Sequence, residues 1–145
     1  MSVRISFDKA EMDLDLIHAF LSGAYWSQGI PRHVVERAIA GSICVAAFAA
    51  DEAGADEQIG FARVISDCAT FAYLADVFVL PGHRGQGVAR AMVEALHAHS
   101  DLQGLRRWAL FTRDMQPVYA KLGWTPYPHP PERLMVREDA GVYGQ

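Results

Sequence analysis

Residues 81–89 (PGHRGQGVA) have the composition of an anion-binding turn. They join the end of a long apolar run to the start of an amphipathic stretch, and they carry glycines at 82, 85 and 87. The first backbone N–H groups of a helix have no partners inside the helix and lie at the positive end of its dipole. Glycines at that point let a phosphate come close. Because Arg84 adds a positive charge, the segment predicts a phosphate site, with a plain connector between strand and helix as the alternative.

Two common nucleotide motifs do not fit this segment. A P-loop needs Gly-Lys-Ser/Thr, and a dinucleotide-binding turn needs a glycine at position 90, where the chain has Arg90. Residues 84–89 (RGQGVA) instead resemble the Arg/Gln-x-x-Gly-x-Gly/Ala pyrophosphate loop of the GCN5-related N-acetyltransferases (GNAT). The resemblance extends to residues 114–124 (DMQPVYAKLGW), which are similar to that family's short helix with a Tyr followed by Lys-Leu-Gly-Phe/Trp. Together the similar segments cover about residues 58–127.

The resemblance implies acetyl-coenzyme A as the acyl donor. Acetyl-coenzyme A would lie where the long strand and a later parallel strand splay apart, and the backbone near Phe78 and Val79 would polarise its thioester carbonyl. A strand edge suits the amides of the pantetheine arm, and a helix N-terminus suits the pyrophosphate. The donor would therefore contact Val77, Phe78 and Val79 through the strand, and Arg84, Gly85, Gln86, Gly87, Val88, Ala89 and Arg90 through the loop and helix.

Acetyl transfer to an amine needs a group that takes a proton from the amine and one that gives a proton to the thiolate. By resemblance Tyr119 is the general acid, the alternative being an aromatic that only packs the short helix. Asp76 is the candidate base, because a carboxylate inside the apolar run 75–80 is costly to bury without a purpose or a partner. Pairing with an Arg, capping of a loop, and proton removal through a water chain remain open.

Several residues could bind the acceptor, a primary amine of a small molecule or peptide. Tyr25 and Trp26 are adjacent aromatics in a loop that the resemblance places beside the acetyl group, the alternative being that they pack over the first helix. Tyr73 shares a strand with Asp76. Arg113 and Asp114 could meet a charged acceptor, although an ion pair or a helix cap would also explain them. The rival function is a non-catalytic module that binds acetyl-coenzyme A as a sensor or structural ligand.

Hydrophobic periodicity predicts the elements that position these residues. Apolar residues spaced for helices predict one helix that ends at Gly23 and another between Pro31 and Gly41, then a helix at 87–100 and a short helix that begins with Asp114 as N-cap and ends at Gly123. Strands are predicted at 3–7, 42–50, 58–66, 70–80 and 108–112, with two brief ones near Trp124 and at 134–136. Strand, helix and strand over 70–112 imply a parallel pair.

The predicted fold class is therefore α/β (α+β), with residues 1–145 as one GNAT-like N-acetyltransferase domain. We expect a mixed, mostly antiparallel central sheet of six to seven strands with a splayed parallel pair, flanked by about four helices.

Composition limits the partners. A net charge of −4 disfavours a nucleic acid, and the longest apolar stretch, residues 43–50, falls short of the about 20 residues of a membrane span. Because residues 1–20 lack a signal-peptide core, we expect a cytoplasmic protein. Two cysteines without metal or redox spacing are expected to be reduced thiols, and the six histidines indicate no metal site. Late strands or helices could also pair two copies in a homodimer.

Overall fold

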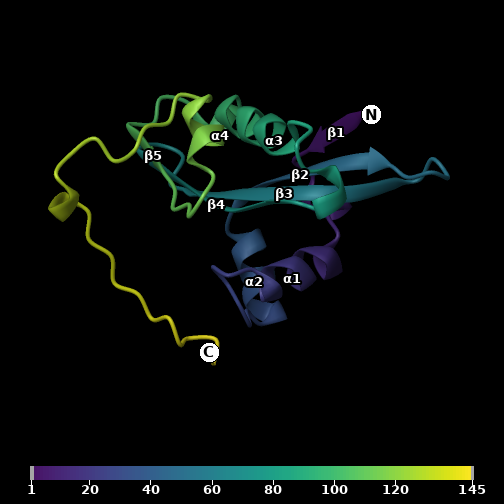
Figure 1. Cartoon of the computed structure of the whole chain (residues 1–145), viewed down its shortest axis with the longest axis horizontal. Helices are drawn as coiled ribbons and strands as arrows, with labels where there is room; N and C mark the ends of the chain where they lie inside the picture. The colour runs from purple at the N-terminus through teal and green to yellow at the C-terminus, as the bar shows by residue number, and fades with distance from the viewer. Residues whose placement is uncertain (1, 145) are drawn as a thin grey trace.

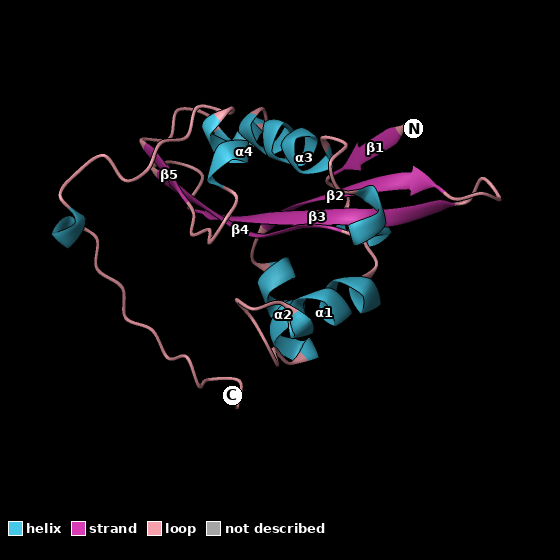
Figure 2. Cartoon of the chain, viewed as in Figure 1, coloured by secondary structure: helices cyan, strands magenta, loops and turns pink. Residues whose placement is uncertain are grey.

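A computed structural model describes residues 2–144. Over this range the chain forms a five-stranded sheet with helices on both faces (Figures 1 and 2). The strands are β1 (Val3–Ser6), β2 (Ile43–Ala50), β3 (Asp56–Ser66), β4 (Phe71–Val79) and β5 (Arg107–Ala109). The α-helices are α1 (Leu14–Gly23), α2 (Arg32–Ala40), α3 (Val88–His97) and α4 (Gln116–Ala120), and the 3₁₀ turns are η1 (Lys9–Glu11), η2 (Pro81–His83), η3 (Ser100–Leu102) and η4 (Pro131–Arg133).

Helices α1 and α2 cover one face of the sheet (Figure 1). The Asp13 carboxylate accepts a hydrogen bond from a backbone N–H of the first turn of α1, which satisfies a donor that the helix itself cannot pair. Ile17 and Leu21, one turn apart, are buried against Phe61 and Phe78 of the sheet. The predicted helix ending at Gly23 and the loop that follows it are confirmed.

Helix α3 and the short α4 lie on the opposite face (Figures 1 and 2). The apolar stripe of α3 is buried against the sheet, as its helical spacing predicts. The residues of this stripe are Val88, Met92, Val93 and Leu96. The sheet thus has a core on each face, and the backbone between β4 and α3 passes from one end of the sheet to the helix N-terminus.

The strands follow chain order in the sheet, β1-β2-β3-β4-β5. Neighbours are antiparallel except β4 and β5, which are parallel as predicted. Their pairing begins at Phe71↔Arg107 and ends at Tyr73↔Ala109. Within residues 2–144, therefore, the β4 backbone from 74 to 79 has no strand on the side that β5 occupies farther down. This open edge is where a splayed pair would leave room for a ligand.

The prediction of six to seven strands is wrong. Neither Trp124 nor the segment 134–136 forms a strand in the part of the chain that the structure describes. Trp124 closes α4 through its backbone N–H, and its indole packs beside His97 of α3. Four prolines in 126–131 remove backbone donors and fix φ, so the following residues reach no sheet edge, and Met135 is 87% exposed.

Several boundaries also differ from the sequence prediction, among them those of β5 and α4. Strand β5 ends at Ala109 rather than at 112, and α4 begins at Gln116 rather than after an Asp114 cap. The Thr112 hydroxyl accepts the Met115 N–H, so Asp114 has no capping role there. Beyond α4 the chain runs mostly exposed, away from the sheet and then toward the side of α2 (Figure 1). No helix within residues 2–144 is long and apolar enough to cross a membrane.

Candidate active site

A β-bulge in β4 forms the centre of the site. The register between β3 and β4 shifts by one residue, so that Asp76 and Val77 together lie opposite Ala62. Asp76 has φ of 56°, a left-handed conformation that aspartate tolerates better than most residues. The bulge turns the Asp76 carboxylate toward the α1–α2 face, just before the open edge at 77–79.

The glycine-rich loop supplies unused donors directly beyond that edge. Within residues 2–144, no backbone acceptor is paired with the consecutive amides of residues 85–90. Gly85 and Gly87 have φ of 76° and 79°, which lets the loop turn into α3, and Gly87 is its N-cap. The Arg84 Nε donates to the Val79 carbonyl oxygen at 2.9 Å. Arg90 pairs with Glu94 on the surface of α3. The predicted loop residues thus present amides and positive charge at one end of β4.

Asp76 is held by two donors. The Arg63 Nε lies 2.6 Å from one carboxylate oxygen, and the Trp26 indole N–H donates to the other at 2.8 Å. Arg63 also donates to the Ser42 hydroxyl at 3.0 Å. The Asp76 and Arg63 side chains are 9% and 15% exposed, so this ion pair is largely shielded from water. Asp76 is therefore paired with an arginine, which is one of the alternatives that the sequence left open for it.

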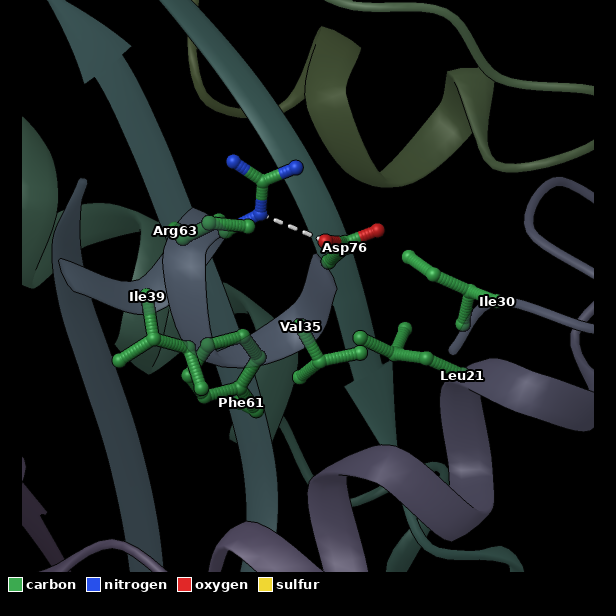
Figure 3. Close-up of a pocket in the computed structure, with 8 residues that line it drawn as sticks. Leu21, Ile30, Val35, Ile39, Phe61, Arg63 and Asp76 are labelled. Carbon is green, nitrogen blue, oxygen red and sulfur yellow. Dashed lines mark hydrogen bonds and ion pairs between the residues drawn. The ribbon is translucent and has the colours of Figure 1, made fainter. Parts of the chain in front are cut away.

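Figure 3 shows the ion pair at one end of a narrow apolar cavity. The cavity has a volume of about 10 Å³, which is near the minimum for a single water molecule. It is lined by side chains of α1, the following loop, α2, β3 and β4, namely Leu21, Ile30, Val35, Ala38, Ile39, Phe61, Arg63 and Asp76. An amine substrate does not fit in this volume, so this cavity is not an acceptor pocket.

Tyr119 lies on α4 and is 8% exposed. Burial raises the pKa of Tyr119 to about 12, and the nearby Tyr25 phenol adds to the rise. The phenol therefore stays protonated throughout the physiological range, the state that a proton donor needs. The same rise makes Tyr119 a weaker acid toward a thiolate, so proton transfer would depend on the geometry around its hydroxyl.

The predicted acceptor residues form a set of aromatic contacts. Tyr25 and Trp26, 52% and 43% exposed, meet edge to face with ring centres 5.2 Å apart. Tyr73, on β4, pairs with Ala109 at the end of β5, and its ring centre lies 5.8 Å from that of Phe111. Burial, and then the charge of Asp76, raise the pKa of Tyr73. Trp26 thus contacts Asp76 directly, Tyr73 lies within reach of the Asp76 charge, and Tyr25 lies near Tyr119.

Sequence reasoning missed Arg63. It is the one charged residue in 58–66, as Asp76 is in 70–80, and the two segments are successive strands of the predicted, mostly antiparallel sheet. Opposite charges that stand alone in neighbouring apolar strands are expected to pair, because either would be costly to bury by itself. That signal could have identified the ion pair. Among residues 2–144, no three His, Cys, Asp or Glu side chains are grouped so that they could hold a metal ion.

Comparison with known proteins decides the family. The sequence pattern of the acetyltransferase (GNAT) domain matches residues 40–126, which contain the bulge, the glycine-rich loop and α4. The chain belongs to the GNAT family of acetyltransferases. Its class of reaction is therefore acyl transfer, and acetyl-coenzyme A is the co-substrate of the family.

Relatives support this membership. A candidate acetyltransferase of Gibberella zeae is 33% identical over 85% of this chain and 79% of its own length. A crystal structure of a candidate GNAT acetyltransferase from Xanthomonas campestris pv. campestris is 47% identical, with a TM-score of 0.90 over 100% of this chain and 99% of that one. Glucosamine-6-phosphate N-acetyltransferase from Arabidopsis thaliana, 15% identical with a TM-score of 0.64 over 95% of this chain and 99% of that one, shares the fold.

The features of this GNAT chain fit acetyl-coenzyme A. The open β4 edge offers backbone groups to an arm that contains amides, and the unpaired amides of 85–90 lie at a helix N-terminus, where an anionic pyrophosphate is stabilised. At Gly85 and Gly87 no atom lies within 4 Å of the position that a Cβ would take, so a ligand has room to approach the backbone there.

Proposed function

We propose that this protein is an N-acetyltransferase that moves the acetyl group of acetyl-coenzyme A to the primary amine of a small molecule or peptide. The observation that carries the proposal is the open β4 edge running into a row of unpaired amides at the start of α3, in a chain of the GNAT family. Acetyl-coenzyme A would supply the acetyl group as an activated thioester.

Backbone groups would do most of the donor binding. The edge of β4 at Val77, Phe78 and Val79 would pair with the pantetheine arm, and the unpaired amides of residues 85–90 would hold the pyrophosphate. Arg84, whose Nε bonds the last carbonyl of β4, would keep the loop at a fixed distance from the strand. The Phe78 and Val79 backbone would also polarise the thioester carbonyl.

Removal of the amine proton has two candidate routes. Asp76 as the base remains a prediction. Its two carboxylate oxygens are already engaged by Arg63 and Trp26, which lowers its availability as a proton acceptor. These contacts favour the alternative, in which water carries the proton away and Asp76 orients Trp26 in the acceptor loop.

Tyr119 would donate its hydroxyl proton to the departing sulfur. Its raised pKa keeps the proton in place until the reaction, and Tyr25 lies close enough to influence it. A general acid of this kind typically contributes about 10²- to 10⁴-fold to the rate.

The test is coenzyme A release with a panel of primary amines, comparing wild type with Tyr119→Phe. We expect Tyr119→Phe to lower kcat by at least about 10²-fold while acetyl-coenzyme A binding, measured by calorimetry, is retained. Tyr127→Phe, which changes an exposed tyrosine in the C-terminal segment, is the matched control and should leave kcat unchanged. Donor binding without turnover on any amine would instead support the non-catalytic module.

A further inference from the structure

Arg113 is an exposed cation that stacks on an aromatic ring. Its guanidinium carbon lies 3.9 Å from the centre of the Tyr25 ring. Within residues 2–144, Arg113 forms no salt bridge, and its side chain donates no hydrogen bond. Asp114, the neighbouring carboxylate, neither pairs with it nor caps α4. Neither a local ion pair nor a helix cap therefore explains this position.

The stacking leaves the N–H groups of Arg113 available to bind an anion. A guanidinium over an aromatic ring uses its flat face, while its N–H groups point outward in its own plane. Those donors match the two oxygens of a carboxylate or phosphate. Because Tyr25 already restricts the side chain, less rotamer freedom is lost when an anion binds.

Arg113 lies among the residues that are predicted to bind the acceptor. Tyr25 adjoins Trp26 on one side and lies near Tyr119 on the other, so Arg113 stands at the rim of the proposed reaction centre. The carboxylate of Asp76 is already neutralised by Arg63. Glu138 is a further carboxylate close enough to Tyr73 to influence the Tyr73 phenol.

We propose that the acceptor is an amine that also carries an anionic group, a carboxylate or a phosphate, and that Arg113 binds this group. The apolar part of the acceptor would rest on Tyr25 and Trp26. This inference rests on the proposed function, because it names the class of amine that the transferase would use.

The experiment compares matched amines that differ in the anionic group. Phenylalanine and γ-aminobutyrate are measured against their amides, and O-phosphoethanolamine against ethanolamine, by coenzyme A release. The proteins are wild type, Arg113→Gln, Arg113→Lys and the control Arg37→Gln, which changes an exposed arginine of α2. Dividing each wild-type preference by that of a variant cancels the intrinsic reactivity of the amine.

We expect wild type to prefer at least one anionic amine over its neutral partner, because an ionic hydrogen bond typically gives about 10- to 100-fold in kcat/KM. Arg113→Gln should remove most of that preference, mainly through KM, Arg113→Lys should keep part of it, and Arg37→Gln should keep all of it. Which pair responds tells a carboxylate acceptor from a phosphate acceptor.

Three outcomes would overturn the inference. Equal use of anionic and neutral amines by wild type would remove its basis, although acetyl transfer itself would stand. An unchanged preference in Arg113→Gln would assign the anion to another residue. Failure of every amine, with acetyl-coenzyme A still bound, would reject the proposed function and this inference together.

Discussion

Asp76→Asn separates the structural role of the buried ion pair from catalysis. Asparagine has the shape of aspartate, tolerates a positive φ, and keeps an oxygen that can accept from Trp26. It removes the negative charge and replaces one acceptor oxygen with an NH₂ donor, so Arg63 and Trp26 can no longer both donate to this side chain. The perturbation therefore leaves a cation that is 15% exposed without its counter-ion.

The expected cost follows from that burial. Removing one partner of a buried ion pair typically costs about 3–5 kcal/mol, and we expect the lower end, about 3 kcal/mol, because the amide still offers a polar contact. For a domain of this size each kcal/mol lowers Tm by about 2–4 °C, so Asp76→Asn should lower Tm by about 6–12 °C.

Urea unfolding of four proteins measures the coupling: wild type, Asp76→Asn, Arg63→Met and the double variant. Each single change should be destabilising, whereas the double variant should be more stable than either single variant because no unpaired charge remains. The control is Glu94→Gln, which breaks an ion pair whose side chains are 55% and 53% exposed and should cost no more than about 0.5 kcal/mol.

The reasoning fails if Asp76→Asn unfolds within about 0.5 kcal/mol of wild type, or if the double variant is less stable than both single variants. Coenzyme A release, measured with the same four proteins, then tests whether Asp76 is the catalytic base. Activity in the folded double variant would exclude Asp76 as an obligatory base. A rate that is lost in every variant lacking the carboxylate, at temperatures where each is folded, would support it.

Three further outcomes can be measured. Gly87→Ala should cost about 1 kcal/mol, because its φ is 79°, and should weaken acetyl-coenzyme A binding in calorimetry; unchanged affinity would argue against the amide site. Burial lowers the pKa of His97, which accepts from Trp124, so its neutral form adds stability above the unfolded value near 6.5 that is lost as pH falls through the folded pKa. His97→Gln, which cannot titrate, should flatten that part of the pH profile of urea unfolding, and an identical profile would contradict the assignment. Burial raises the pKa of the Cys44 thiol to about 11, so a thiol reagent at pH 8 should label the exposed Cys68 in the native protein and both cysteines only in denaturant.

Local patterns predicted most of the elements. Helical spacing of apolar residues identified α1, α2 and α3, because each buries one stripe against the sheet. The alternation of turns and apolar runs identified β1 to β4. The pattern failed at the C-terminus, where residues 134–136 have the composition of a strand but stay exposed and pair with none of the five described strands. Strand formation depends on a partner, which sequence spacing alone does not supply.

The sequence by itself determined the glycine-rich loop, the family resemblance and the candidate Tyr119, since each depends on residue types within a short segment. Only the tertiary structure decided what surrounds them. Asp76 is paired with Arg63 because a bulge turns it toward the α1–α2 face, and Arg113, which follows β5, is stacked on Tyr25 of the loop 24–31. Both contacts join residues far apart in the chain. Their energies depend on distance and burial, which exist only after folding.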